Sequence, residues 1–184
     1  MLIDPPVLEN DRVLLSPLTL GNYQVLYPIA AQEKLVQYSP SDIQTPEALK
    51  QYVEIALEKQ KVNSAILFLV FDKRTNQYAG STRFMNIDHI NKVVEIGATW
   101  IGREFQGTGL NREMKLLMLD CAFWEMDFEK VEFRIDERNV RSRRAVEKLG
   151  ATLEGILRRN VYLLDGYKRN TCCYGILREE WARS

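Results

Sequence analysis

The sequence of 184 residues is poor in histidine and cysteine, and this shortage excludes several kinds of site. The single histidine, His89, cannot form a histidine-rich metal centre, and we expect it in an exposed turn over residues 88–92. The three cysteines, Cys121, Cys172 and Cys173, show neither zinc-ligand spacing nor a disulfide framework. No histidine is near the last two to activate a thiol. We therefore predict reduced thiols in a cytoplasmic protein, with no metal site and no covalent cysteine catalysis.

The sequence also lacks an excess of charge of either sign and any long apolar run. Lysine and arginine together number 25, as do aspartate and glutamate, so no overall charge attracts nucleic acid or an anionic membrane. No apolar run approaches the length that spans a bilayer, and residues 1–11 lack the basic start and apolar core of a secretory signal. We expect no direct nucleic-acid binding and no membrane association. Basic residues do gather locally, at Arg138, Arg141, Arg143 and Arg144.

Regular hydrophobic patterns run along the whole chain, without a repeat or a linker, and indicate one domain over residues 1–184. The predicted strands are 12–17, 65–72, 78–87, 93–101, 130–136, 153–164 and 167–177, and the predicted helices are 21–31, 46–61, one from residue 110, and 141–149. The helix between residues 101 and 130 is a crossover, so the strands on either side of it should be parallel. Short turns, such as Asp165-Gly166, join most other strands. The pattern predicts an α/β (α+β) fold with a mixed, mostly antiparallel sheet of about seven strands flanked by helices.

A short glycine loop, Gln106-Gly107-Thr108-Gly109, lies between the strand 93–101 and the helix that begins near Leu110. Glycine lets the backbone approach a bulky ligand closely. The unpaired N–H groups at the start of the helix and its dipole then favour an anion in front of the loop. On these residues alone, a simple capping turn is the commoner explanation.

Further segments make the sequence resemble the GNAT superfamily of acyl-CoA-dependent N-acyltransferases. The family's phosphate loop is Gln/Arg-x-x-Gly-x-Gly/Ala, and Gln106, Gly109 and Asn111 occupy its fixed positions here, with Asn111 departing from the usual Gly or Ala. Residues 95–101, 136–142, 148–151 and 153–155 resemble the branch that acetylates the N-termini of ribosomal proteins. The resemblance runs from about residue 12 to 181. It is specific for the superfamily but not for the substrate, because that branch also contains antibiotic-modifying members.

The resemblance implies that coenzyme A lies along the end of the strand and the glycine loop. Loop N–H groups would bind its pyrophosphate, and residues 99–101 would offer backbone groups to the pantetheine arm and to the oxyanion of the tetrahedral intermediate. Asn139 would lie near the sulfur, although it is also a suitable N-cap. Trp100 is assigned mainly to packing. The implied cofactor-binding residues are Thr99, Trp100, Ile101, Gln106, Gly107, Thr108, Gly109, Leu110, Asn111 and Asn139.

Glu95 and Ser142 are the candidate catalytic residues. Glu95 would accept the proton of the attacking amine, for which its pKa must be raised by burial or a water must relay the proton. The alternative is an ordinary strand carboxylate that faces solvent. Ser142 would donate a hydrogen bond or a proton to the departing thiolate, or merely lie at the N3 position of its helix. The family's usual tyrosine and glutamate cannot be carried over, because Val146 and Val161 stand at those positions.

The implied reaction transfers an acetyl group from acetyl-CoA, a co-substrate, to a primary amine by direct attack in a ternary complex, without a metal. We expect a protein N-terminal α-amine as the acceptor, with a small-molecule amine or antibiotic as the alternative. A non-catalytic acyl-CoA-binding module is a further alternative, favoured by Val146 and Val161. A different nucleotide-phosphate binder is disfavoured, because no Gly-Lys-Ser/Thr accompanies the loop. The edge of the last hairpin is compatible with pairing in a homodimer.

Overall fold

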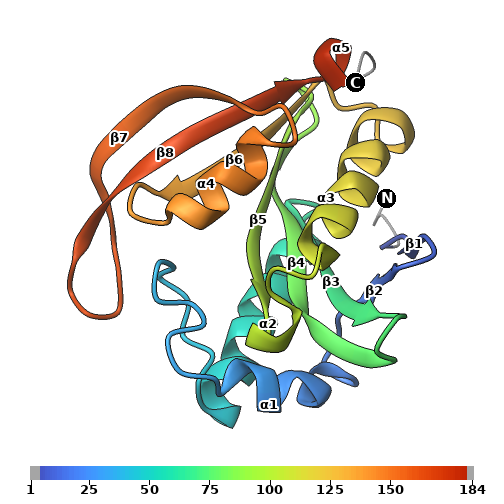
Figure 1. The fold of residues 1–184 in the computed structure, drawn as a ribbon, viewed down its shortest axis with the longest axis vertical. Coiled ribbons are helices and arrows are strands. Elements are labelled where there is room, and N and C mark those ends of the chain that lie inside the picture. The colour runs from blue at the N-terminus through green and yellow to red at the C-terminus, as the bar shows by residue number, and fades with distance from the viewer. Residues whose placement is uncertain (1–4, 182–184) are drawn as a thin grey trace.

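The computed structural model describes residues 5–181, and its eight strands form one open sheet (Figure 1). The strands are β1 (Leu8–Glu9), β2 (Val13–Pro17), β3 (Ala65–Asp72), β4 (Gln77–Asp88), β5 (Val93–Ile101), β6 (Lys130–Asp136), β7 (Thr152–Tyr162) and β8 (Lys168–Leu177). Their order across the sheet is β1-β2-β3-β4-β5-β6-β8-β7. Only β5 and β6 pair in parallel, so the predicted crossover and the mostly antiparallel sheet are confirmed. The predicted strands omitted β1, which is too short to show alternation.

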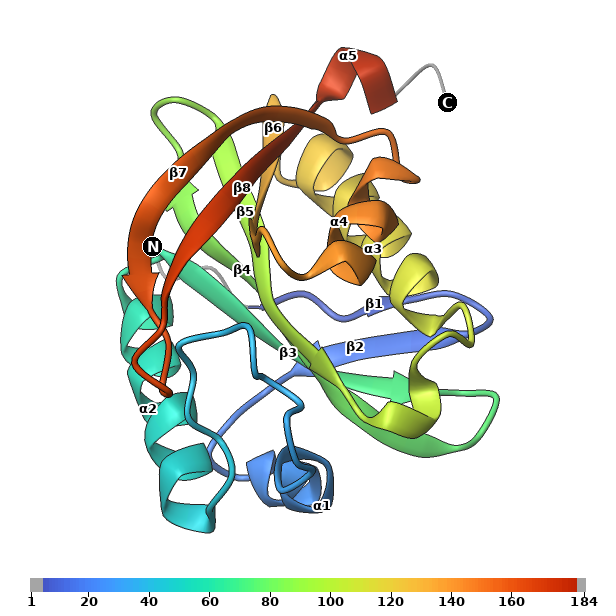
Figure 2. The same cartoon turned by 60° about the vertical axis from the view of Figure 1, so that its left-hand side comes forward.

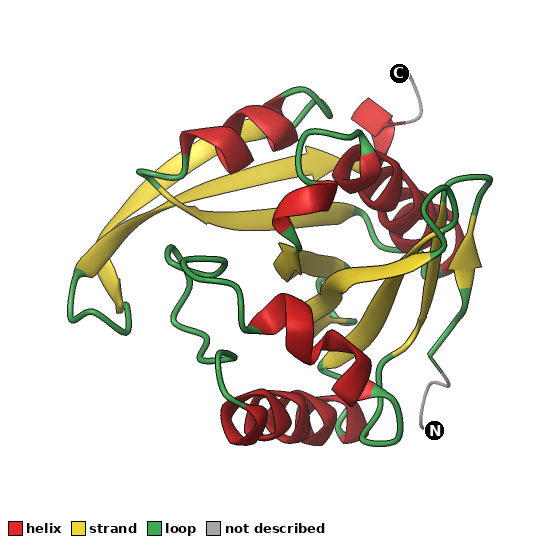
Figure 3. Ribbon diagram, turned by 60° about the horizontal axis from the view of Figure 1, so that its bottom comes forward, coloured by secondary structure: helices red, strands yellow, loops and turns green. Residues whose placement is uncertain are grey.

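Helices cover both faces of this sheet (Figure 3). They are the 3₁₀ helix η1 (Tyr23–Leu26), α1 (Tyr27–Ala30), α2 (Pro46–Lys61), the 3₁₀ helix η2 (Arg103–Phe105), α3 (Leu110–Asp120), its π-helical continuation η3 (Cys121–Glu125), α4 (Val140–Glu147) and α5 (Arg178–Trp181). One core cluster joins the sheet to α3 and α4, and a second joins the other face to η1, α1 and α2. No helix within residues 5–181 is long and apolar enough to cross a membrane.

The predicted helices 21–31 and 46–61 have different outcomes. The second is confirmed as α2, with Thr45 Oγ1 accepting a hydrogen bond from the Ala48 N–H and Pro46 in the first turn. The first was wrong as a single helix, because the structure divides it into η1 and α1. Pro28 lies in the first turn of α1, where its missing N–H is tolerated; in the interior of a longer helix it would break a hydrogen bond.

The two halves of the sheet separate between β5 and β6 (Figures 1 and 2). Their parallel pairing covers only Val93–Glu95 against Lys130–Glu132, after which β6 pairs with β8 alone. From residue 96 to Ile101, β5 therefore has a strand partner only on its β4 side. The stretch of β5 without a strand partner on this side begins directly after Glu95.

A bulge in β5 reverses which side chains face which helices. The register with β4 shifts between Ser81 and Arg83, and Ala98 on the opposite strand has a φ of 45°. Before the bulge, Ile96 packs in the cluster of α3; after it, Trp100 packs in the cluster of α1 and α2. A non-glycine residue at positive φ costs on the order of 1–3 kcal/mol, and such strain concentrates at functional sites.

Candidate active site

The glycine loop has a conformation that glycine favours and a surface with open space. Gly107 has a φ of 77° and Gly109 a φ of 89°, and a Cβ added at either would meet no atom within 4 Å. Thr108 Oγ1 donates to the carbonyl of Phe105 at 2.7 Å and accepts from Nη2 of Arg12 at 3.3 Å. These contacts hold the loop on its inner side and leave its outer surface open.

The backbone donors of the loop fit a phosphate group. Gly109 is the N-cap of α3 and supplies no side chain to cap it. Within residues 5–181 no hydrogen bond uses the backbone N–H groups of Gly107, Thr108, Gly109, Asn111 or Arg112. A row of free N–H groups at the positive end of a helix is a favourable anion site. Whether each of the predicted residues from Gln106 to Asn111 contacts the cofactor stays a prediction.

Gln106 connects the end of β5 to the start of α4. Its Nε2 donates to the carbonyl of Ile101 at 3.1 Å, and its Oε1 accepts from Nη1 of Arg141 at 2.6 Å. This bond brings a cation of α4 to the loop. In the sequence, Arg141 belongs to a basic cluster and has no evident partner. The position of α4 against the loop, which no local pattern reveals, supplies that partner.

Asn139 and Ser142 form the N-terminal cap of α4. The Asn139 side chain accepts from the Ser142 N–H at 3.2 Å, so the capping role is confirmed. The Ser142 side chain is half-buried, and its hydroxyl makes no hydrogen bond to another described residue. Their contacts with a cofactor or a thiolate stay predictions.

The end of β5 combines packing with an exposed backbone edge. Trp100 is 4% exposed and donates from Nε1 to the Tyr52 hydroxyl at 3.4 Å, which confirms its packing role. Ile101 is buried on the α3 side, and Thr99 is half-buried with its hydroxyl near that of Thr82 at 2.7 Å. β6 does not pair with β5 beyond Glu95. The backbone groups of residues 99–101 on that side are therefore free to contact an acyl chain.

Glu95 is a buried carboxylate at the point where β5 and β6 separate. It is 5% exposed, so the alternative of a solvent-facing strand residue is wrong. Asn86 Nδ2 donates to its Oε2 at 2.6 Å, and Arg134 Nε lies 3.7 Å from the same oxygen. Burial raises the pKa of Glu95, and the Asn86 hydrogen bond and the Arg134 charge offset only part of that rise. A raised pKa is what a carboxylate base needs near neutral pH.

Lys115, on α3, is a buried cation that the sequence analysis missed. It is 5% exposed, and its Nζ donates to Thr99 Oγ1 at 2.6 Å. Within residues 5–181 it forms no ion pair, and burial lowers its pKa to about 7. The sequence feature that could have revealed this burial is the position of Lys115 directly after Met114, beside the apolar face of the helix. On the same face, Leu110, Met114, Met118 and Cys121 are buried and Leu117 is partly buried.

The remaining candidate groups are poor proton carriers or nucleophiles. Val146 is buried in α4 and Val161 is half-buried on β7, and neither can exchange a proton. Burial raises the pKa of Cys121 to about 12 and also raises the pKa values of Cys172 and Cys173. His89 is exposed, as expected. Residues 5–181 contain no group of three or more His, Cys, Asp or Glu side chains placed to hold a metal ion.

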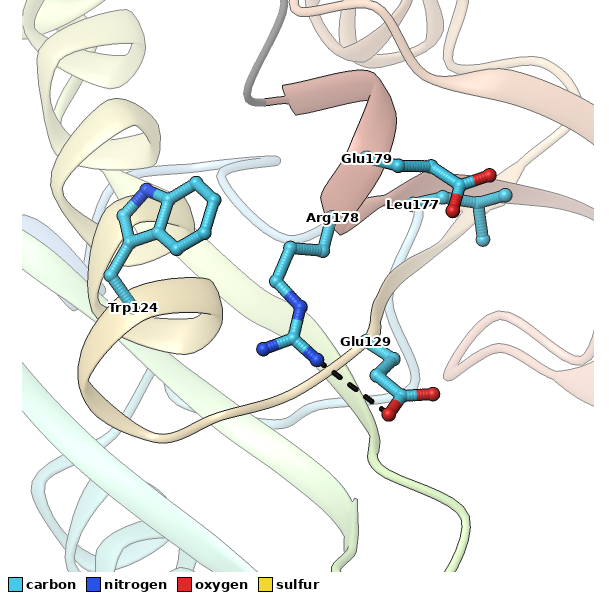
Figure 4. A pocket seen from close by; sticks show the side chains of 5 residues that line it. All are labelled: Trp124, Glu129, Leu177, Arg178 and Glu179. Atoms are coloured by element: carbon cyan, nitrogen blue, oxygen red, sulfur yellow. Dashed lines mark ion pairs between the residues drawn. The ribbon is translucent and has the colours of Figure 1, made fainter.

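Two hollows lie at different ends of the molecule. One, of about 370 Å³, is lined by Asn10, Asp11, Arg12 and Glu113 and adjoins the loop through the contact of Arg12 with Thr108. The other, of about 390 Å³, is shown in Figure 4 and is lined by Trp124, Glu129, Leu177, Arg178 and Glu179. The second lies where β6 begins, at the opposite end of that strand from Asn139, and takes no part in the site.

Comparison with known proteins agrees with this geometry. The acetyltransferase (GNAT) domain family matches residues 12–152. YdaF of Bacillus subtilis (strain 168), provisionally named a ribosomal N-acetyltransferase, is 27% identical over 136 residues, which are 74% of this chain and 68% of YdaF. A crystal structure of a provisionally assigned acetyltransferase from T. thermophilus has a TM-score of 0.87 at 30% identity, covering 100% of this chain and 95% of that chain.

A more distant solved structure shares the fold. The spermidine N-acetyltransferase from Vibrio cholerae, in complex with CoA and spermine, has a TM-score of 0.78 at 19% identity, covering 94% of this chain and 99% of that chain. The family match covers most of the chain, and the sheet with its open β5 edge agrees with it. The chain belongs to the GNAT family and is an acetyl-CoA-dependent N-acetyltransferase.

Proposed function

We propose that this enzyme acetylates a primary α-amine, with a protein N-terminus as the first acceptor to test, and that Glu95 is its general base. The observation that carries the proposal is the buried Glu95 carboxylate at the point where the pairing of β5 with β6 ends. Its Oε2 is held by Asn86, whereas Oε1 accepts no hydrogen bond from residues 5–181. That second oxygen is free to accept a proton from an amine or from a bridging water.

The free N–H groups of Gly107, Thr108, Gly109, Asn111 and Arg112 would hold the diphosphate of acetyl-CoA, and the open edge of β5 would bind its pantetheine arm. The bound thioester supplies the activated acetyl group. A backbone N–H near the Ala98 bulge would stabilise the oxyanion, since a donor fixed in advance acts most strongly on charge that develops during the reaction. Holding both substrates in one cleft supplies a large further part of the rate enhancement.

An α-amine suits this base better than a lysine side chain does. With a pKa near 8, an α-amine is already partly neutral at pH 7, whereas a lysine amine near 10.4 is almost entirely protonated. The name of YdaF supports a ribosomal-protein N-terminus, and the spermidine enzyme among the structural neighbours supports a small polyamine. The pKa argument favours the first of these. Ser142 would donate a hydrogen bond to the departing thiolate from the first turn of α4.

A non-catalytic acyl-CoA-binding module is the second candidate, because Val146 and Val161 stand where relatives carry proton-transferring side chains. The raised pKa of Glu95 and its free oxygen are not needed for binding alone and favour catalysis.

Mass spectrometry of acetyl-CoA mixed with N-terminal peptides, amino acids and polyamines tests the proposal directly. We expect acetylation of α-amines, lost in Glu95→Gln with CoA affinity retained. Tight CoA binding without any acetylated product would support the binding module instead.

A further inference from the structure

Arg83 on β4 has a buried donor without a partner. Its Nε is buried and makes no hydrogen bond, and within residues 5–181 its guanidinium forms no ion pair. The guanidinium carbon lies 5.0 Å from the centre of the Tyr52 ring. A buried polar group without a partner is unfavourable, and such groups in native proteins are commonly completed by a ligand or water.

Arg83 lies on the same face of the sheet as Glu95. Its neighbours Thr82 and Phe84 face α3, so Arg83 faces the side of α1 and α2. In the register with β5, Arg83 is opposite Gly97, and Glu95 is two residues before Gly97 on the same face. Diagonal cross-strand neighbours of this kind lie about 7–8 Å apart, within reach of long side chains.

Gly97 has no side chain, and two neighbouring side chains lie over it. A Cβ added at Gly97 would lie 2.8 Å from Met85 Sδ and 3.1 Å from Glu95 Oε1, so the Glu95 carboxylate leans over the residue that pairs with Arg83, with Met85 beside it. The oxygen that leans is the one without a hydrogen bond. A free carboxylate oxygen and an unpaired guanidinium therefore border one stretch of the sheet, with no ion pair between them.

The neighbouring arginines on this face already have partners. Arg134 lies 3.6 Å from Glu132 and 3.7 Å from Glu95. Arg138 pairs with Asp136 at 2.8 Å. Arg169 donates to the Tyr38 carbonyl at 2.7 Å and to Thr171. Arg83 thus differs from them, because no acidic group or carbonyl within residues 5–181 pairs with its guanidinium.

Building on the proposed function, we propose that Arg83 selects acceptors that carry a carboxylate close to the reacting amine. The carboxylate would complete the guanidinium with charge-assisted hydrogen bonds, while the amine would approach Glu95 Oε1 on the same face of the sheet. The acceptor class is an amino acid with its own carboxylate, or a peptide N-terminus with an acidic side chain in its first two residues. A polyamine would instead place a second cation beside Arg83, and like charges repel.

Equilibrium binding to the CoA-saturated enzyme tests this selection without requiring turnover. Calorimetry would compare pairs that differ only in the anionic group: alanine with alaninamide, and the peptides Ala-Glu-Ala-amide and Ala-Gln-Ala-amide. We expect the carboxylate member of one pair to bind about tenfold tighter or more. The pair that responds identifies the source of the carboxylate. Equal affinities in both pairs, or no binding of either carboxylate member, would overturn the inference.

Variants then assign the preference to Arg83. Arg83→Gln should abolish it and Arg83→Lys should retain part of it, because lysine keeps the charge but loses the planar fork. Arg158→Gln, which removes one positive charge from the exposed edge strand β7, is the matched control and should keep the full preference. A preference that persists in Arg83→Gln would refute the assignment. The comparison of the ligand pairs on the wild-type enzyme needs no variant, so it remains valid if a variant fails to fold.

Acetyl transfer measured on the same compounds separates the two proposals. A carboxylate preference in binding without any acetylated product would refute the proposed function and leave the role of Arg83 standing. Product formed equally well from alaninamide, alanine and spermidine would support the acetyltransferase and refute the selection by Arg83.

Discussion

Asn86 donates a 2.6 Å hydrogen bond to Oε2 of Glu95 and leaves Oε1 of that carboxylate without a donor among the described residues. One oxygen is thereby oriented and the other is available. The same bond opposes the rise in the pKa of Glu95 that burial causes. The hydrogen bond from Asn86 therefore influences both the orientation of the Glu95 carboxylate and its pKa.

Replacing Glu95 with glutamine tests its role as the base. Glu95→Gln removes the proton acceptor but keeps the shape of the side chain, so kcat/KM should fall by about 10²–10⁴-fold while CoA affinity is unchanged. Glu58→Gln on the exposed face of α2 is the control and should have no effect on either quantity. Steady-state kinetics and calorimetry provide both measurements. A Glu95→Gln enzyme with wild-type turnover would remove Glu95 from the mechanism.

Replacing Asn86 should move the pH at which activity is lost. Glu95 acts as a base only when deprotonated, so kcat/KM should fall as pH drops through its raised pKa. The Asn86 bond lowers that pKa, so Asn86→Gly should raise it further and shift the acidic limb of the profile to higher pH. Glycine tolerates the φ of 50° at this position without strain.

Asn76→Gly is the matched control for this shift. Asn76 has a φ of 55° in the turn between β3 and β4 and makes no contact with Glu95. The acidic limb of the pH profile of Asn76→Gly should coincide with that of the wild type. An acidic limb that stays in place in Asn86→Gly would show that another group governs the profile.

Much of the fold was predictable, because local patterns determine its central elements. Continuous apolar residues predicted β3 with its observed bounds, Ala65–Asp72, and a Thr-Pro cap predicted the start of α2 at Pro46. The bulge at Ala98 was not predictable, because its φ of 45° has no signal in an ordinary apolar segment. It depends on the pairing of β5 with β4, which is a tertiary property.

The site divides in the same way. The free N–H groups of the loop follow from its glycines and from the start of α3, both visible in the sequence. Arg83 and Glu95 are twelve positions apart and lie together only through the strand register, and Lys115 meets Thr99 only through packing of α3 on the sheet. A sequence shows that such charged residues are present, but it does not show which residues they contact in the folded protein.

Replacing Lys115 with methionine should stabilise the protein. In the folded state burial lowers its pKa from the ordinary 10.5 to about 7, so between these values the unfolded chain holds a proton that the folded chain does not. The contribution of Lys115 therefore makes stability rise with pH across that window. Lys115→Met removes this dependence and the cost of burying an amine, a gain on the order of 1–4 kcal/mol at neutral pH.

Urea unfolding at several pH values measures this effect as the difference between wild type and variant. The difference should be largest near pH 7 and shrink toward pH 10.5. Thr99 keeps a partner in the variant, because its hydroxyl also lies 2.7 Å from that of Thr82. A difference that is constant with pH would contradict a lowered pKa at Lys115.

Two matched glycines separate phosphate binding from backbone strain. Gly109 and Gly166 have φ values of 89° and 82°, and a Cβ at either would meet no atom within 4 Å. Replacing either glycine with alanine should therefore lower the free energy of unfolding by a similar amount, about 1–2 kcal/mol. Only Gly109→Ala changes the loop whose free N–H groups face the proposed diphosphate, so its CoA affinity should fall at least about tenfold while Gly166→Ala binds CoA normally. Thermal unfolding and CoA calorimetry on both variants decide the matter, because equal CoA affinities at equal stability loss would mean that the diphosphate lies elsewhere.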